Sequence, residues 1–346
     1  MALKELWSEL CRGEWEFVAN KVRNNLFHNY LPTLQVSQSL PTVLVASSAR
    51  SGSTWLMELL LKTAPYRVLF EAVPNAEFSL RDFETPRYVL SAGHSLDERT
   101  DFVTSLQHCD RRDWSQQHRN SRNIHWLARG VLIKSTRANF CLDFLQTHLG
   151  GQTLRVIYLI RNPFDVIRSK ILKKSVAGGQ FVSKFCYDPL QLFATDDPFF
   201  QAYFERYRPL LGNAPSDVQQ EAFIWCLENR WLLDVWHERG WSLVVYENLA
   251  LEFEQTFCQL LDDIGLPFRQ RVLASRQVRS STAYAGRGRE MVASAEFRNI
   301  GDSLTRWRDF FSVRQQREIA AVMDGFGIDY NVLLDNSVRE RVDYSA

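Results

Sequence analysis

The sequence predicts an α/β fold in three layers, with a mostly parallel central sheet, a P-loop-like phosphate loop, and helical or irregular insertions. Short apolar runs rich in β-branched residues alternate with segments of helical spacing, and one run leads through "SSARSGST" directly into a helix. Strands that alternate with helices form a parallel sheet that binds ligands at the carboxyl ends of its strands. The predicted strands are Thr42–Ala46, Tyr66–Phe70, Gly130–Lys134, Leu154–Ile160 and "WSLVVYE" (241–247).

Helical spacing of apolar residues predicts the segments between and after these strands. Gly265 and Pro267 end the helix within "TFCQLLDDIGLP", and "VRQQREIAAVMDGFGIDY" is the last predicted helix. The other predicted helices are Thr54–Lys62, Asn139–His148, Asp165–Lys174 and Val218–Glu238.

We expect residues 41–346 to form a single domain, preceded by a helical extension over residues 1–40. Apolar residues recur at helical spacing from Leu3 to Leu26, which favours helices docked on the domain over a peripheral anchor at a membrane surface. Residues 175–217 are irregular and rich in aromatic and turn residues, typical of an insertion that covers a substrate or packs as a structural excursion. Its aromatic residues could stack on sugars or serve a core: Phe181, Phe185, Tyr187, Phe193, Phe199 and Phe200.

The composition excludes several classes of protein. Among 346 residues, 41 Lys and Arg balance 40 Asp and Glu, so the net charge of +1 gives no general attraction to nucleic acid. The sequence has no apolar run long enough to span a membrane and no signal-peptide pattern, so we expect a cytoplasmic protein. The six cysteines are scattered, which indicates buried thiols and no structural zinc site.

The segment between the first strand and its helix has the features of an anion site. The first N–H groups of a helix have no partner within the helix, and the helix dipole favours negative charge there. Gly52 allows a close approach of the backbone, Arg50 adds positive charge, and the hydroxyl groups come from Ser51, Ser53 and Thr54. The sequence therefore predicts a phosphate site, with an ordinary capped helix start as the alternative.

A second anion site is expected where "YLIRNPFDVIRSK" follows a strand. Arg161 lies at the strand end and Ser169 about two turns into the next helix, so both can reach the same edge of the sheet. The first loop lacks the first glycine and the lysine of the nucleoside-triphosphate motif, which disfavours a magnesium-dependent kinase.

Together, "RSGSTW" and "RNPFDVIRS" resemble the 5′-phosphosulfate loop and the 3′-phosphate site of sulfotransferases that use 3′-phosphoadenosine 5′-phosphosulfate (PAPS). "VVYENLALEFEQTFCQLLDDIGLP" and "LTRWRDFFS" are similar to later segments of that family, so the resemblance runs from about Pro41 to Tyr330. It implies sulfuryl transfer from PAPS to a hydroxyl group without a metal cofactor. It also implies that the 5′-phosphosulfate is held by Arg50, Ser51, Gly52, Ser53 and Thr54, and the 3′-phosphate by Arg161 and Ser169.

The resemblance also bears on the acceptor and the base. Relatives that act on small alcohols and phenols carry Lys in place of Arg50 and a His where this chain has Thr136. The arginine-type loop is similar instead to that of carbohydrate and glycolipid sulfotransferases, including bacterial ones, whose base is a glutamate about twenty residues after the loop. Glu71 lies at that position. We therefore expect a saccharide or glycolipid acceptor, with Glu71 as base.

Several alternatives stay open. His94 and His125 are the other candidate bases, and Lys134 at a strand end could neutralise charge on the sulfuryl group or be a surface lysine. Arg287 and Arg289, in "AYAGRGRE", resemble a mobile basic loop that closes on the 3′-phosphate in some relatives, although a solvated loop fits equally well. The alternative functions are a catalytically idle nucleotide- or sugar-binding module and a kinase-like phosphotransferase.

Overall fold

The computed structural model describes residues 39–73, 89–95, 103, 104, 106, 128–149, 154–176, 188–212, 215–275 and 304–342. The predicted N-terminal helices lie outside these residues, as do His125, Arg287 and Arg289. Phe181, Phe185 and Tyr187 of the predicted insertion also lie outside them.

A five-stranded parallel sheet forms the centre of the fold. Its strands are β1 (Thr42–Ser47), β2 (Tyr66–Phe70), β3 (Gly130–Ser135), β4 (Leu154–Ile160) and β5 (Ser242–Val245), in the order β2-β3-β1-β4-β5. The first four strands agree with the prediction, because runs buried on both faces consist mostly of apolar residues. The fifth is shorter than predicted, since helix α10 (Tyr246–Leu251) begins immediately after Val245.

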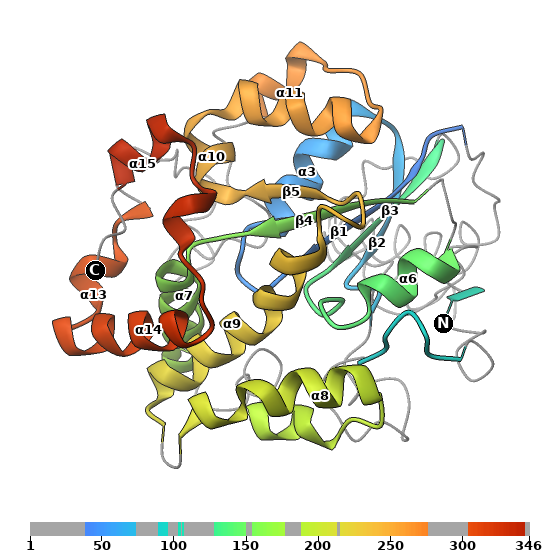
Figure 1. The fold of residues 1–346 in the computed structure, drawn as a ribbon. Helices are drawn as coiled ribbons and strands as arrows, with labels where there is room; N and C mark the ends of the chain where they lie inside the picture. The colour runs from blue at the N-terminus through green and yellow to red at the C-terminus, as the bar shows by residue number, and fades with distance from the viewer. Residues whose placement is uncertain are drawn as a thin grey trace, which may run out of the picture.

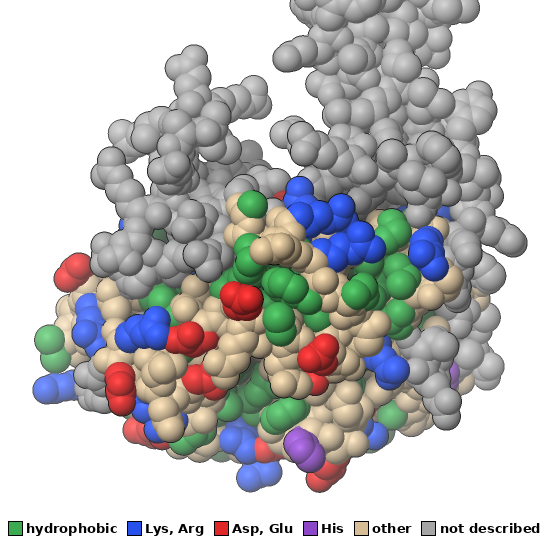
Figure 2. Space-filling view, turned by 90° about the horizontal axis from the view of Figure 1, so that it is seen from above, with side chains coloured by type: hydrophobic (Ala, Val, Ile, Leu, Met, Phe, Trp, Pro, Cys, Tyr) green, Lys and Arg blue, Asp and Glu red, His purple; other side chains and the backbone are tan. Residues whose placement is uncertain are grey.

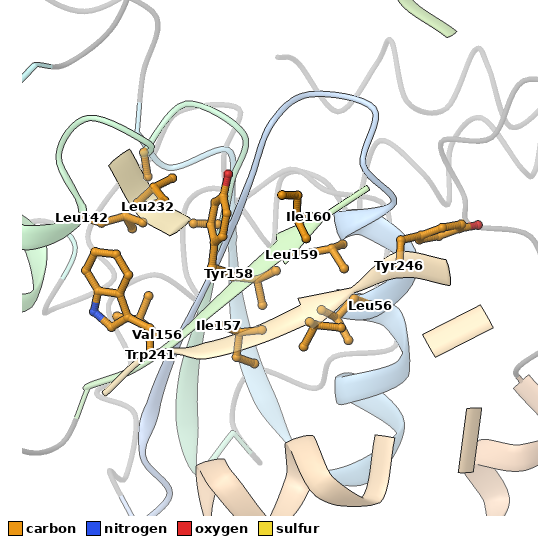
Figure 3. Packing of buried hydrophobic residues seen from close by; sticks show 14 of the residues in the cluster. Leu56, Leu142, Val156, Ile157, Tyr158, Leu159, Ile160, Leu232, Trp241 and Tyr246 are labelled. Atoms are coloured by element: carbon orange, nitrogen blue, oxygen red, sulfur yellow. The ribbon is translucent and has the colours of Figure 1, made fainter. Parts of the chain in front are cut away.

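Helices cover both faces of the sheet, which confirms the three-layer α/β fold (Figure 1). On one side lie α3 (Ser53–Thr63) and α11 (Phe253–Ile264), and on the other α6 (Leu142–Leu149) and α9 (Asp217–Val235). Figure 3 shows the alternation of side chains along β4 that makes this possible. Tyr158 points to the side of Leu142 and Leu232, whereas Leu159 points to the side of Leu56 in α3.

The strand order places a ligand site at the carboxyl ends of the central strands. The chain leaves β1 for β2 and β3 on one side and then crosses to β4 and β5 on the other. In parallel α/β sheets, such a reversal leaves a crevice at the carboxyl edge. Strand β1 pairs with β3 on one side and β4 on the other, so the segments that follow these three strands emerge side by side.

Helices α7 and α6 begin two and three residues away from their predicted starts. Helix α7 (Pro163–Val176) starts before Asp165, since Pro163 has the backbone angle of a first helical turn and needs no N–H partner there. Helix α6 starts at Leu142, because Asn139 and the two residues after it form a turn.

The described part of the insertion is helical, so the prediction of irregular structure is wrong there. It contains two 3-10 helices, Pro189–Ala194 and Arg208–Leu211, and helix α8 (Pro198–Tyr207). Asp188 and Asp197 each accept hydrogen bonds from backbone N–H groups of the helix that follows, and each precedes a proline.

The aromatic residues of this segment contribute to the core. Phe200 is completely buried and packs against Phe140 and Trp231, with ring centroids 5.6 Å and 5.2 Å apart. Phe199 is half exposed and Phe193 is partly buried. The described aromatic side chains therefore favour the core interpretation over sugar stacking for Phe200.

The C-terminal part of the fold consists of short helices. Helix α14 (Val313–Gly325) packs on α9, and the chain then forms a 3-10 helix, Tyr330–Leu333. The remaining elements within the described residues are α13 (Trp307–Phe310), α15 (Asn336–Val342) and the 3-10 helix Gln270–Ser275. In the parts of the chain that the structure describes, no helix is long and apolar enough to cross a membrane.

Candidate active site

The loop between β1 and α3 has the backbone geometry of an anion site. Arg50 and Gly52 both adopt positive φ, at 75° and 92°, and Gly52 caps α3 without a side-chain hydrogen bond to the helix. A non-glycine residue with positive φ is strained, and such strain is concentrated at functional sites. The N-terminal N–H groups of α3 are thus left without a side-chain cap at the carboxyl edge of the sheet.

The hydroxyl groups predicted for this loop lie in or beside it. Ser51, Ser53 and Thr54 are buried. Within the described residues, the Ser51 hydroxyl oxygen has no hydrogen-bond partner. A buried polar atom without a partner costs about 1–3 kcal/mol, so a bound phosphate oxygen would satisfy Ser51 where the protein does not.

The structure brings the two predicted anion sites together. Arg50 Nε donates a hydrogen bond to Ser169 Oγ over 2.9 Å, and Arg161 Nη1 donates to the carbonyl oxygen of Arg50 over 3.4 Å. Arg50 and Ser169 are 119 positions apart in the sequence. One connected group of cationic and hydroxyl side chains therefore joins the ends of β1 and β4.

The ring of Tyr246 packs against this group of side chains. The sequence did not lead us to predict Tyr246 as a site residue. The Arg161 guanidinium lies 4.4 Å from the centroid of the Tyr246 ring. The same ring lies against Gly52, where an added Cβ would come within 2.6 Å of it. The residue was expected in a strand, whereas it opens α10, whose first turn lies at the sheet edge.

A second cluster lies at the ends of β2 and β3. The Glu71 carboxylate pairs with Lys134 through Oε1 and accepts two hydrogen bonds from Thr136 through Oε2, from the backbone N–H over 2.8 Å and the hydroxyl over 2.9 Å. Glu71 also has a positive φ of 53°. Lys134 and Glu71 are both buried, and Lys134 lies 4.6 Å from the centroid of the Phe70 ring. Lys134 is therefore no surface lysine.

Burial and charge act in opposite directions on this cluster. Burial alone would raise the pKa of Glu71, but the positive charges of Lys134 and Arg137, with the hydrogen bonds from Lys134 and Thr136, outweigh it and lower the pKa. Burial lowers the pKa of Lys134, which Glu71 partly offsets, and the charges of Arg137 and Arg50 lower it further. Glu71 is thus a carboxylate at neutral pH.

Glu247 is buried beneath the Arg161 site. It accepts hydrogen bonds from the Tyr330 hydroxyl and, over 3.2 Å, from the backbone N–H of Asn162. Burial is the main cause that raises the pKa of Glu247 from 4.5 to about 7, and the charge of Arg161 opposes the shift. An acid whose pKa is higher in the folded state binds more protons when folded, so the free energy of unfolding falls as the pH rises from 4.5 through 7.

We therefore expect Glu247→Gln to remove a pH-dependent loss of stability. Relative to the variant, the wild type should lose about 3 kcal/mol of unfolding free energy between pH 4.5 and about 8. Urea unfolding at a series of pH values measures this difference, with the exposed Glu254→Gln as a matched control. A constant difference between wild type and Glu247→Gln over this range would contradict the assignment.

A buried polar network supports the loop from the opposite face of the sheet. Asn229 Nδ2 donates to Ser48 Oγ over 3.0 Å, and the Tyr158 hydroxyl donates to Asn229 Oδ1. These contacts were not predicted, although an asparagine within the apolar run "AFIWCLEN" is a signal for a buried polar contact.

His94 is the candidate histidine base that lies within the described residues, and its neighbours are Asp197 and Phe144. His94 Nδ1 lies 3.8 Å from the Asp197 carboxylate, and its ring packs edge-on against Phe144. Among the residues that the structure describes, no group of three or more His, Cys, Asp or Glu side chains is arranged to hold a metal ion.

The surface agrees with local recognition of anions. Figure 2 shows Lys and Arg side chains gathered in one cluster bordered by hydrophobic side chains, while the other charged side chains on this face are scattered and of mixed sign. With a net charge of only +1, attraction of an anionic ligand depends on such local arrangements.

Comparison with known proteins places the site in a family context. The family model described as "Sulfotransferase domain" matches residues 40–326. Among curated proteins, none matches the chain significantly. Two solved structures similar to the chain are the sulfotransferase domain from the curacin biosynthetic pathway and a mouse sulfotransferase complexed with PAP. The first is 16% identical with a TM-score of 0.43, over 85% of this chain and 99% of that chain. The second is 12% identical with a TM-score of 0.41, over 92% and 93%.

Proposed function

Because this chain belongs to the sulfotransferase family and transfers a sulfuryl group from PAPS, we propose that its acceptor is a hydroxyl group of a carbohydrate or glycoconjugate, with Glu71 as base. The observation that carries the proposal is the contact between Glu71 and Thr136. Thr136 stands where relatives acting on phenols have a histidine, and here that residue holds the carboxylate. The arginine-type loop with Arg50 is the second support.

The site residues take complementary roles in this proposal. Glu71 accepts the proton of the acceptor hydroxyl while the acceptor oxygen bonds to sulfur and the bond from sulfur to the phosphate oxygen breaks. Arg50 stabilises the negative charge that grows on the departing phosphate, as cations do in phosphoryl transfer. Lys134 neutralises charge on the sulfuryl oxygens. The products are the sulfate ester, a proton and adenosine 3′,5′-bisphosphate (PAP).

The donor site is proposed to follow the loop and the end of β4. Ser51, Gly52, Ser53 and Thr54 hold the 5′-phosphosulfate together with Arg50. Arg161 and Ser169 hold the 3′-phosphate, supported by their contacts with Arg50. Further support is the orphaned Ser51 hydroxyl and the strained loop.

We also propose that residues 41–346 act as one domain. Supporting this, strands from Thr42 to Val245 share one sheet, and the C-terminal helix α14 packs on α9. Residues 1–40 would then be an extension to that domain.

The first test of function is a thermal-shift titration with PAP beside ATP with magnesium, followed by an acceptor screen. A ligand that binds only the folded state raises its apparent stability. We expect PAP alone to raise the melting temperature, and PAP release from PAPS to accelerate with saccharides but not with small phenols. Acceleration by phenols alone would overturn the proposed acceptor class, and a shift only with Mg-ATP would overturn the donor site.

We expect Arg50→Ala and Arg161→Ala each to weaken PAP binding about 10- to 100-fold, because each removes charged hydrogen bonds to phosphate. Isothermal titration with PAP measures the loss. Arg314→Ala is the matched control, since Arg314 is exposed on α14 and pairs with Glu318. Wild-type affinity in either site variant would contradict its assignment.

A further inference from the structure

The pair formed by Glu71 and Lys134 presents a conflict between binding and catalysis. Thr136 occupies Oε2 with two hydrogen bonds, so Oε1 is the oxygen of Glu71 left to receive a proton. That same oxygen is bound to the Lys134 ammonium group. A proton cannot be accepted readily by an oxygen that already receives a hydrogen bond from a buried cation, because the cation stabilises the charged carboxylate.

The charges around the pair suggest how the conflict is resolved. Lys134 lies within electrostatic reach of Arg137 and Arg50, and Arg137 also acts on Glu71, so positive charge gathers around this ion pair. The buried ammonium group of Lys134 needs an anion near it at all times, since an uncompensated buried charge is strongly destabilising. A sulfuryl group arriving next to Arg50 would be such an anion.

The register of the sheet places Lys134 within reach of the donor loop. Val45 in β1 pairs with Lys134 in β3, and Ala46 pairs with the next residue, Ser135. The phosphate loop follows only a few residues after Ala46, at the same edge of the sheet. Lys134 therefore lies between the carboxylate of Glu71, which follows β2, and the loop after β1.

We propose that Glu71 and the sulfuryl group of PAPS compete for Lys134, so that the donor draws the ammonium group away from Glu71 and frees Oε1 to accept the acceptor's proton. This inference rests on the proposed function and adds a control of when Glu71 can act as base. In the free enzyme Glu71 is paired with Lys134. Glu71 is released to act as base when the group to be transferred is in place. PAP lacks the sulfuryl group and leaves the pair intact.

The competition has an unusual consequence for binding. Removing the negative charge of Glu71 frees Lys134 in advance, so PAPS should bind more tightly to Glu71→Gln than to wild type, while PAP should not. The ratio of PAPS affinity to PAP affinity isolates this effect, because both ligands share the adenosine and the two phosphate positions. In general, coupling between two residues is measured by a double-mutant cycle.

The experiment is isothermal titration of PAP and PAPS, without acceptor, into wild type, Glu71→Gln, Lys134→Met and the double variant. We expect the PAPS-to-PAP ratio to rise about tenfold in Glu71→Gln, which corresponds to roughly 1.4 kcal/mol. It should fall in Lys134→Met, and the gain from Glu71→Gln should vanish when Lys134 is also replaced. Exposed Glu254→Gln should leave the ratio unchanged.

Two results would overturn the competition: an unchanged ratio in Glu71→Gln, or a gain that persists in the double variant and so does not act through Lys134. Lys134→Met leaves Glu71 buried without its lysine partner and could fail to fold. The double variant carries neither charge. Its comparison with Glu71→Gln still shows whether the gain in PAPS affinity acts through Lys134. These titrations involve no acceptor. A non-carbohydrate acceptor would therefore refute the proposed function without affecting them, whereas absent PAP binding in wild type would refute the donor site itself.

Discussion

Glu71→Gln is expected to reduce kcat by about 10²- to 10⁴-fold while leaving PAP affinity within about twofold. Glutamine cannot accept the acceptor's proton, but its amide oxygen can still receive the hydrogen bonds that Thr136 donates to Oε2. The side chain should therefore stay in place, and the loss should fall on the chemical step. The measurement is the rate of PAP release at saturating PAPS and acceptor, with PAP affinity from isothermal titration.

The control for this variant is Glu254→Gln, the same change on the exposed face of α11, which should keep full turnover. If Glu71→Gln instead retained wild-type kcat, the role of base would pass to His94 or His125, and alanine variants of both would be tested next. If PAP binding also collapsed, Glu71 would be a structural residue of the donor site.

The sheet could be predicted from the sequence because its strands have a strong and simple signal. Runs such as "LRVIYLI" are buried on both faces, so nearly every residue is apolar. The end of the last strand was less predictable. "VVYE" continues the β pattern in sequence, but Tyr246 turns into α10 and its ring packs over Gly52. Tertiary packing decides that boundary.

The helical structure of the insertion was missed although its signals are present. Asp188 followed by Pro189, and Asp197 followed by Pro198, were interpreted as turns. The same pairs also begin helices, since the aspartate accepts from free N–H groups and proline suits the first turn. An Asp-Pro pair alone does not distinguish a turn from the start of a helix. The tertiary structure decides, because Phe200 packs into the core.

For the candidate site, the sequence predicts which residues reach the carboxyl edge but not which of them touch. Arg50, Glu71 and Lys134 each follow or end a predicted strand, so their common edge follows from the fold. The ion pair between Glu71 and Lys134 depends on a positive φ at Glu71, and no local pattern indicates a left-handed glutamate. The contact of Arg50 with Ser169 likewise depends on the packing of α7 beside the loop.

Gly52→Ala is expected to disable the donor site even though it adds only one methyl group. Gly52 has a φ of 92°, in the left-handed region, and an added Cβ would lie 2.6 Å and 2.7 Å from two carbon atoms of the Tyr246 ring. The strain of the backbone costs about 1–2 kcal/mol, and overpacking against the ring about 1–3 kcal/mol more. Either the loop keeps its shape and the protein is destabilised by that sum, or the loop moves and PAP affinity falls about 30-fold or more.

Gly240→Ala separates the two causes, because Gly240 also has positive φ, at 67°, but has no atom within 4 Å of its added Cβ. We expect that variant to lose only about 1–2 kcal/mol of unfolding free energy and no PAP affinity. Urea unfolding and PAP titration of both variants give the comparison. If the two variants lost the same unfolding free energy and PAP affinity, the close approach of Tyr246 to the loop would not contribute to stability or binding. Tyr246 would then not hold the phosphate loop beside Arg161.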